Sequence, residues 1–421
     1  MALGRAGGLK GIQPRTPQSW LEAFQQLEHF IELSSPSWKK KKRVVFLDEL
    51  PWLDTPRSRF MAAFEQFWNA WASKRRDIIL VVCGSAASWM IREVVQARGG
   101  LHNRVTRRLR LLPFTLRETE AFLNSRSVKL TRYQIIELYM ATGGVPYYLK
   151  EAESGKSSAQ IVDALCFSPQ GLLRDEFEKL YASLFRHWKQ NLSIIKAMAK
   201  KLSGQTRNEI LNAARFASGG TVSKRFGELE ESGFIMRTVP FGGKENDALF
   251  RVADEFSLFH LKWMTSSRHR NAKPGHWQSV HGSPSWRAWS GYAFEGICLK
   301  HIEEIRHALR IGGVQTEESS WRFVPPKGQR EKGAQIDLVI DREDACINLC
   351  EMKYSDKPFT IDKRFANDLV RKRSVFQRQT NTRRTLFLTM LSPDGLEPNE
   401  YATELIAAEL DLESLFRPRP M

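Results

Sequence analysis

The sequence contains few cysteines and no long apolar run. Its five cysteines match neither the spacing of a disulfide framework nor that of a zinc module, which favours a protein of a reducing cytoplasm. The most apolar stretch, residues 78–91, is interrupted by glycine and serine and is too short to cross a bilayer. The first residues lack the apolar segment of a secretory signal. We therefore expect a cytoplasmic protein without a membrane partner.

Positive charge, by contrast, is in excess. The chain has 64 lysines and arginines against 47 acidic residues, which gives a formal net charge of +17. Such an excess favours a polyanionic partner, and DNA is the leading candidate. Apolar residues make up 42% of the 421 residues, so most of the chain should fold, and its length predicts several domains.

The N-terminal part has the pattern of an α/β domain. Residues 1–18 are rich in Gly, Pro and Arg and are expected to be a disordered tail, whereas residues 19–33 have the apolar spacing of a helix with Ser19 as its cap. Two apolar runs, residues 44–47 and 78–83, predict buried strands of a parallel sheet, and a helix is predicted between them. Alternating strands and helices predict an α/β fold.

The rest of the chain predicts three further modules. Residues 131–186 are predicted to be mainly helical. Residues 187–267 predict three short helices followed by a β-hairpin, the order of a winged helix-turn-helix. Residues 268–285 are expected to be a linker. Residues 286–415 predict a second α/β unit, with a helix over residues 286–309, three strands, a basic helix and a last strand.

The first apolar run ends in two carboxylates, Asp48 and Glu49. In a Walker B strand such a pair lies at the carboxyl end, where the Asp helps to hold Mg²⁺ and the Glu polarises the attacking water. The second run is followed by Ser85, at the place of a nucleotide sensor. Many buried parallel strands end in an acidic residue, so a purely structural role is an equally simple interpretation of the pair alone.

Two further motifs make the pattern specific: Leu-Pro-Phe at residues 112–114 and Gly-Gly-Val-Pro-Tyr-Tyr at residues 143–148. Together with the acidic strand end, they resemble the archaeal-type AAA+ ATPase family, in which an ATPase core precedes a winged helix and a C-terminal nuclease-like domain. The similarity extends from about residue 17 to residue 412. The resemblance implies an ATPase core over residues 19–130 and a helical lid over residues 131–186.

The resemblance also assigns roles to single residues. It implies that Asp48 and Glu49 are the Walker B pair and that Ser85 is the first sensor. Three arginines would lie in the region of the inter-subunit arginine that contacts ATP: Arg104, Arg107 and Arg108. ATP is the ligand that the family implies, and a homo-oligomer or an ATPase partner chain is the expected assembly.

The sequence has no phosphate-binding loop of the form Gly-x-x-x-x-Gly-Lys-Ser/Thr, the Walker A motif. Residues 7–11 have its composition but not its spacing. By the resemblance, the loop would precede the helix at residues 19–33, so we expect a truncated sheet whose two strands pair directly, stay exposed or borrow a strand. We therefore predict poor ATP binding and loss of ATP hydrolysis, through either a misassigned start or a true loss.

Three cations of the predicted winged helix are candidates for DNA contact: Lys224 and Arg225 on its third helix, and Lys244 between its strands. Three glutamates on the same helix would repel phosphate. A structural role between the ATPase core and the C-terminal domain is therefore the alternative.

A second chemical pattern lies near the C-terminus. Glu351 and Lys353 are two residues apart on a predicted strand and therefore share a face, and Asp337 on the preceding strand can converge on them. The two carboxylates would hold Mg²⁺, which lowers the pKa of a bound water, while the lysine would orient that water. Glu295, on the preceding helix, could supply a third carboxylate.

This order of elements resembles the PD-(D/E)xK nuclease superfamily: a helix with Glu, strands with Asp and Glu-x-Lys, then a helix and a strand. The resemblance implies Mg²⁺-dependent cleavage of DNA, and the basic helix at residues 361–379 would suit a phosphate backbone. Two alternatives remain open. The charges could form an exposed cross-strand pattern, and the chain could be a non-catalytic DNA- or protein-binding remnant.

Overall fold

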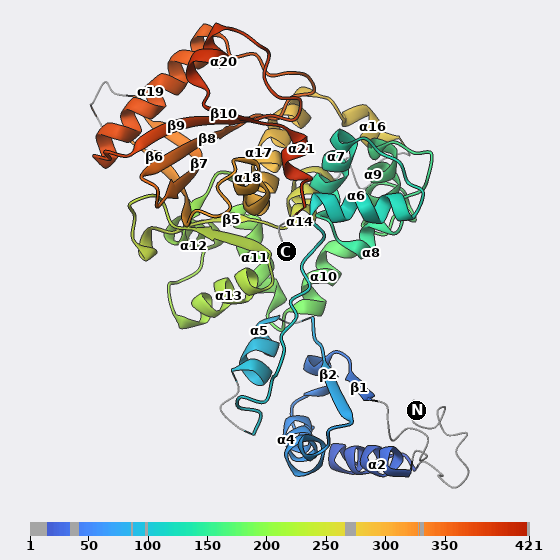
Figure 1. Cartoon of the computed structure of the whole chain (residues 1–421). Helices are drawn as coiled ribbons and strands as arrows, with labels where there is room; N and C mark the ends of the chain where they lie inside the picture. Colours follow the sequence, from blue (N-terminus) through green and yellow to red (C-terminus); the bar gives the residue numbers. More distant parts are fainter. Residues whose placement is uncertain are drawn as a thin grey trace. The chain divides into compact units, whose positions relative to one another are not determined.

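The computed structural model describes residues 15–33, 42–85, 87–96, 100–265, 275–326, 328 and 332–418. The chain divides into two compact units, an N-terminal unit (Met1–Arg110) and a C-terminal unit (Leu111–Met421) (Figure 1). Both contain helices and strands, so the protein is of the mixed α/β class with several small sheets. Most of the predicted tail, including the glycine-rich segment at residues 7–11, lies outside the described residues.

Two parallel strands form the sheet of the N-terminal unit in its described part. Strands β1 (Arg43–Leu47) and β2 (Ile78–Val82) pair along their whole length, from Arg43 opposite Ile78 to Leu47 opposite Val82. Both strands lie where the apolar runs predict them. They pair directly, which is one of the three arrangements expected for a sheet without its first strand.

Aromatic side chains form the core of the N-terminal unit. Phe24 and the buried Phe60, Phe64 and Phe67 lie in ring contact, with centroids 4.9 to 6.0 Å apart. The Ser19 hydroxyl accepts a hydrogen bond from the N–H of Glu22, as its predicted cap role requires. The helical elements are α2 (Trp20–Leu33), α3 (Leu50–Leu53), α4 (Phe60–Gln66) with its π-helical continuation (Phe67–Trp71), a 3₁₀ turn (Ala72–Lys74), α5 (Ala87–Met90) and a π-helical turn (Ile91–Val95).

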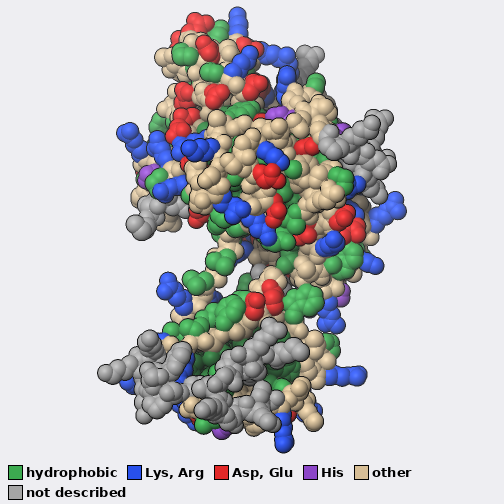
Figure 2. Space-filling view, turned by 90° about the vertical axis from the view of Figure 1, so that its right-hand side faces the viewer, with side chains coloured by type: hydrophobic (Ala, Val, Ile, Leu, Met, Phe, Trp, Pro, Cys, Tyr) green, Lys and Arg blue, Asp and Glu red, His purple; other side chains and the backbone are tan. Residues whose placement is uncertain are grey.

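One face of the two-stranded sheet is exposed. Val44 and Phe46 on β1 lie opposite Ile79 and Val81 on β2, and all four side chains are solvent-exposed, Phe46 at 57%. Hydrophobic side chains accordingly gather on the surface of this unit in Figure 2. Alternate residues of a strand point to opposite faces, and those of the other face, such as Val45 and Leu80, are only half-buried, so the prediction of buried strands is wrong. The N-terminal unit therefore leaves part of its apolar surface unburied.

The C-terminal unit begins with a helical segment. Three of its helices start with a capping box, in which Thr115, Thr131 or Ser157 accepts the N–H of the residue three positions later. The mainly helical character predicted here is confirmed, while a lid function stays a prediction. The helices are α6 (Leu116–Ser125), α7 (Arg132–Thr142), α8 (Pro146–Leu149), α9 (Ser158–Cys166) and α10 (Glu176–Leu184).

Three helices and a small sheet follow, in the order predicted for a winged helix-turn-helix. The sheet has the order β3-β5-β4 and is antiparallel. Strand β3 is only two residues long and was not predicted from the sequence. The elements are α11 (Trp188–Met198), β3 (Gln205–Thr206), α12 (Arg207–Ala214), α13 (Gly220–Glu231), β4 (Ile235–Thr238), a 3₁₀ turn (Glu245–Asp247), β5 (Leu249–Val252), α14 (Glu255–Phe259) and a π-helical turn (His260–Met264).

The hairpin between β4 and β5 is anchored to the C-terminal sheet. The N–H of Phe241 donates to the carbonyl of Ser320 over 2.8 Å, and Pro240 forms an isolated β-bridge with the same residue. The Phe241 ring also packs on Phe376, with centroids 5.1 Å apart. The β4–β5 hairpin, predicted to be the wing of a winged helix, is thus held by the neighbouring α/β part.

The predicted linker at residues 268–285 is wrong in its second half. Residues 266–274 lie outside the described ranges, but α16 (His276–Val280) is a helix with its tryptophan, Trp277, fully buried. The Asp163 carboxylate accepts the N–H groups of Gly275 and Trp277, each over 2.7 Å. The segment is therefore ordered by aromatic packing and by a buried carboxylate, neither of which a count of loop-forming residues detects.

The helix predicted over residues 286–309 is two helices, α17 (Pro284–Lys300) and α18 (Ile302–Ala308). The break is at His301, whose buried ring accepts the N–H of Leu116 through Nε2 over 3.1 Å. His301 is thereby held by a partner far away in the sequence. No helix in the described part of the chain is long and apolar enough to cross a membrane.

A mixed sheet of five strands completes the C-terminal unit, in the order β10-β9-β8-β7-β6. Strands β6, β7 and β8 are antiparallel neighbours, and β8, β9 and β10 are parallel. Helix α19 packs on one face of this sheet and α17 on the other (Figure 1). The elements are β6 (Thr316–Phe323), β7 (Ala334–Arg342), β8 (Cys346–Met352), α19 (Lys363–Thr380), β9 (Thr385–Leu391), α20 (Glu400–Leu405), β10 (Ala408–Leu410) and α21 (Leu412–Leu415).

Candidate functional site

Asp337, Glu351 and Lys353 come together at one end of the β7–β8 pair. The strand pairing ends at Leu338 opposite Cys350, so Asp337 and Glu351 are the next residues on the two strands. The Lys353 ammonium donates to Glu351 Oε1 over 2.9 Å, and the Asp337 carboxylate accepts the backbone N–H between them over 3.2 Å. The structure therefore places side by side the three residues that the strand pattern predicted to converge.

Helix α19 adds a fourth charged group that the sequence reasoning did not assign to the site. The Lys372 ammonium donates to both oxygens of Glu351, each over 2.8 Å, and the Glu351 side chain is only 6% exposed. Lys372 is one of many cations in the basic helix, and no local spacing singles it out. The packing of α19 on the sheet brings it to Glu351 across 21 positions of sequence.

Glu295 lies close to these carboxylates on helix α17 but has its own partner. Its Oε1 accepts a hydrogen bond from Arg251 Nη1 over 2.7 Å, and both side chains are largely buried. Arg251 belongs to β5, so this ion pair links the small antiparallel sheet to helix α17. The link depends on residues 44 positions apart and was not predicted.

The electrostatics of the site are dominated by crowded acidic groups. Burial, followed by the negative charges of Glu351 and Glu295, raises the pKa of Asp337 to about 7. Burial alone would lower the pKa of Lys353, but the carboxylates of Glu351 and Asp337 outweigh it and raise that pKa. A further positive charge would therefore favour the ionised form of Asp337.

Two carboxylates, Asp337 and Glu351, are the candidate ligands for a metal ion, and a Mg²⁺ site stays a prediction. Within the described residues, no group of three or more His, Cys, Asp or Glu side chains could hold a metal ion. Glu295, predicted as a third ligand, is instead paired with Arg251. Mg²⁺ prefers oxygen ligands, retains several waters and is commonly bound through one or two carboxylates. Asp337 and Glu351 supply that number.

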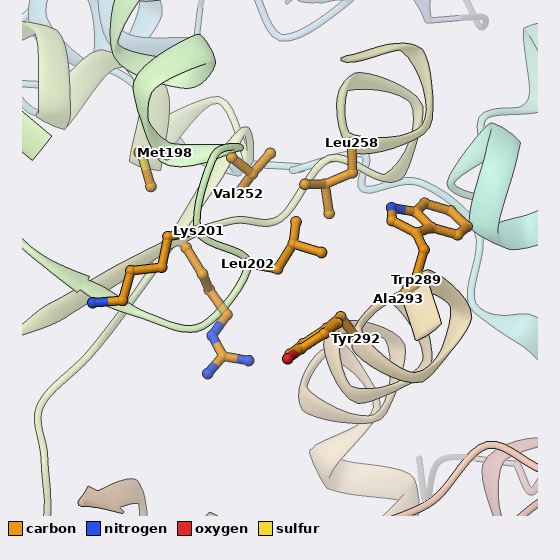
Figure 3. Close-up of a pocket in the computed structure, with 10 residues that line it drawn as sticks. Met198, Lys201, Leu202, Val252, Leu258, Trp289, Tyr292 and Ala293 are labelled. Carbon is orange, nitrogen blue, oxygen red and sulfur yellow. The ribbon is translucent and has the colours of Figure 1, made fainter. Parts of the chain in front are cut away.

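A pocket partly lined by Arg251 lies between strand β5 and helices α11, α14 and α17 (Figure 3). It has about 380 Å³ of space, which is continuous with solvent. Its walls are mainly apolar, with Lys201 and Tyr292 at their polar ends, and Trp289 closes one side. None of the predicted site residues lines it. The pocket is therefore a feature separate from the carboxylate site.

The acidic strand end of the N-terminal unit also has the predicted arrangement. Glu49 accepts hydrogen bonds from the Ser85 hydroxyl over 2.9 Å and from the Ser85 N–H over 3.2 Å. The Asp48 carboxylate accepts the Cys83 thiol over 2.6 Å. Asp48, Glu49 and Ser85 are thus brought together where β1 and β2 end. A role of these residues in binding nucleotide stays a prediction.

The three arginines expected near an inter-subunit contact lie after this site, in a segment without regular secondary structure. Arg104, Arg107 and Arg108 are all exposed. Exposure is compatible with contact to another chain, but it is also the ordinary state of an arginine. Their role stays a prediction.

One of the predicted DNA contacts of the winged helix is wrong. Arg225 is 6% exposed, and its guanidinium forms an ion pair with Glu228 one turn later on α13, at 2.9 Å. Position 225 shares the inner face of the helix with Val222 and Leu229, which are also buried. Arg225 therefore cannot reach a phosphate from this position. Lys224 and Lys244 are exposed, and their contact with DNA stays a prediction.

Comparisons with known proteins give distant similarities. No protein-family model matches the chain. The uncharacterized protein MJECL04 of Methanocaldococcus jannaschii is 20% identical over 361 residues, which cover 82% of this chain and 76% of that protein. Among solved structures, the Walker-type ATPase PABY2304 of Pyrococcus abyssi is similar with a TM-score of 0.41 and 14% identity, over 62% of this chain and 74% of that one.

Proposed function

We propose that the C-terminal unit hydrolyses phosphodiester bonds of DNA with Mg²⁺, in a protein of the AAA+ ATPase type that does not hydrolyse ATP by itself. The observation that carries the proposal is the convergence of Asp337, Glu351 and Lys353 at the end of two paired strands. Such crowding of buried carboxylates lowers the stability of the fold. Groups of this kind are concentrated at functional sites, which supports a functional role here.

Each residue has a definite part in this chemistry. Asp337 and Glu351 would hold the metal ion, and the N–H of Met352 orients the Asp337 carboxylate toward the strand end. Bound Mg²⁺ would lower the pKa of a water ligand and offset charge on the phosphate. The Lys353 ammonium, fixed by Glu351, would orient the attacking water and stabilise the charge that develops on the phosphate oxygens.

The charge of the chain supports DNA as the substrate. The net charge of +17 favours a polyanion, and helix α19, which contributes Lys372 to the site, carries several more cations. These are Lys363, Arg364, Arg371, Arg373 and Arg378. A phosphate backbone that follows this helix would be led to the carboxylates, and its binding should weaken as salt is added.

Cleavage of supercoiled plasmid DNA tests the proposal. We expect nicking by the full chain with Mg²⁺ and none in EDTA, and we expect Lys353→Met to reduce the rate by about 10²-fold because the water and the transition state lose one charged donor. Lys357→Met is the matched control, since Lys357 is exposed four residues later. Equal rates in wild type and Lys353→Met would rule out this site assignment.

We also expect this chain to bind Mg-ATP weakly, without saturation at a ligand concentration of about 1 mM. The sequence offers no Gly-x-x-x-x-Gly-Lys-Ser/Thr loop whose backbone amides could surround the phosphates, although Asp48, Glu49 and Ser85 lie together. Isothermal titration calorimetry of the full chain measures this directly. Micromolar binding of Mg-ATP would show that another segment takes the place of the loop.

A non-catalytic role in binding DNA or protein is the second candidate. It is favoured by the contacts of Glu351, because both of its oxygens are already hydrogen-bonded to lysine ammonium groups. In that case plasmid DNA would be bound in a salt-dependent manner but would stay intact with Mg²⁺.

A further inference from the structure

Glu351 is the only carboxylate among the described site residues that bonds two lysines. The geometry points to Lys372 as an internal competitor of a metal ion: its ammonium donates to both Glu351 oxygens and must leave them before a divalent cation binds both. This inference rests on the proposed function, because it concerns the regulation of the same site. It assigns Lys372 a positioning role that its place in a basic helix does not suggest.

The contacts of the two lysines are not equivalent. Lys353 bonds only Oε1 of Glu351, and its second contact is the carbonyl of Met352 at 3.3 Å. Lys372 donates to Oε1 and Oε2 together, so its ammonium faces the open edge of the carboxylate. A hard divalent cation needs lone pairs of these same oxygens. A cation that binds both oxygens of Glu351 therefore competes with the Lys372 contact.

The same helix provides a second partner for the displaced ammonium. Lys372 Nζ already lies 3.8 Å from Asp368, one turn earlier on α19. Asp368 is more exposed than Glu351 and also pairs with Arg371 over 2.6 Å. Rotation of the flexible lysine side chain is enough to move the charge from Glu351 to Asp368. The exchange therefore needs no movement of the backbone.

Two consequences of opposite sign follow for metal affinity. Removal of the Lys372 charge abolishes the competition, so a divalent cation should bind more tightly. Removal of the Asp368 charge leaves the displaced ammonium with a poorer second partner, so a divalent cation should bind more weakly. A purely structural role of Lys372 does not predict this pair of opposite effects.

Titration of the full chain with Mn²⁺, followed by the electron paramagnetic resonance of free Mn²⁺, tests the inference without any need for catalysis. For Lys372→Met, which keeps the length of the side chain, we expect binding about tenfold tighter than wild type, which corresponds to about 1.4 kcal/mol. For Asp368→Asn we expect binding severalfold weaker. Lys357→Met, which removes an exposed charge nearby, should bind as wild type does.

Unchanged or weaker Mn²⁺ binding by Lys372→Met would overturn the inference, and so would the absence of binding in every variant. If Lys372→Met is poorly folded, as judged by circular dichroism, Asp368→Asn decides alone: unchanged or tighter binding contradicts the exchange. Failure of the proposed function has a different signature. Mn²⁺ would then bind with the expected order of affinities, while plasmid DNA stays uncut by the wild type.

Discussion

Replacement of Asp337 by asparagine should reduce Mg²⁺-dependent cleavage of plasmid DNA by about 10³-fold or more, because the metal ion loses one of its two carboxylate ligands. The neutral amide keeps the shape of the side chain, so the fold should persist. Asp341→Asn is the matched control on the same strand, since Asp341 lies at the far end of β7, where it pairs with Arg384 over 2.6 Å. Equal cleavage by Asp337→Asn and wild type would contradict the metal-ligand role.

Asp337→Asn should lower the cleavage rate but raise the free energy of unfolding at neutral and higher pH. Burial raises the pKa of Asp337 to about 7, above the ordinary value of 3.8 expected in the unfolded chain. Between these values the folded protein retains a proton that the unfolded chain loses, so the free energy of unfolding falls as pH rises from about 4 to about 7. Each pKa unit corresponds to about 1.4 kcal/mol.

Thermal melts of the metal-free protein check this part of the prediction. Because asparagine does not ionise, Asp337→Asn should be more stable than wild type at pH 8, and the difference should shrink toward pH 4. Added Mg²⁺ should stabilise the wild type at pH 8 but not the variant, since the cation favours the ionised carboxylate. If Asp337→Asn is less stable than wild type at pH 8, the ionised Asp337 carboxylate does not destabilise the folded protein, and the prediction is wrong.

Replacement of Phe60 by alanine should unfold the N-terminal unit and leave the C-terminal unit folded. Phe60 is fully buried, and its ring contacts Trp20 at a centroid distance of 4.9 Å and Phe64 at 5.9 Å. Loss of a buried phenylalanine costs about 3 to 5 kcal/mol, which a small unit with an exposed sheet face cannot absorb. Limited proteolysis of the full chain should remove the N-terminal unit and spare residues after about 111.

Phe46→Ala is the matched control for this prediction. It deletes the same ring, but from a side chain that is 57% exposed, so its effect on stability should stay within about 0.5 kcal/mol. Equal protease sensitivity of Phe46→Ala and Phe60→Ala would contradict this prediction. It would mean that the sheet face with Phe46 and Val81 is covered in the intact protein and contributes to its core.

Local sequence patterns predicted the strands and the site residues that lie on them. The apolar runs located β1 and β2. The two-residue spacing of Glu351 and Lys353 placed both on one face of a strand, and the structure joins them by a hydrogen bond. Such predictions succeed because strand periodicity is a property of neighbouring residues. Asp337 required only the further assumption that the two strands are adjacent.

The partners of these residues could not be predicted from local patterns. Lys372 reaches Glu351 through the packing of α19, and Arg251 reaches Glu295 through the docking of two modules. Arg225 is a different case, because the spacing of Val222, Phe226 and Leu229 does indicate a buried helix face, and position 225 lies on it. The periodicity of the buried face, and not the charge of the residue, determines the environment of position 225.

The anchored hairpin described above has a mechanical consequence. Phe241 is hydrogen-bonded to Ser320 of β6 and packs on Phe376 of α19, and Arg251 of β5 is joined to Glu295 of α17. The β4–β5 hairpin is therefore tied at two points to the α/β part that follows it. These ties oppose movement of the β4–β5 hairpin relative to the five-stranded sheet, so the two parts are expected to move as one body.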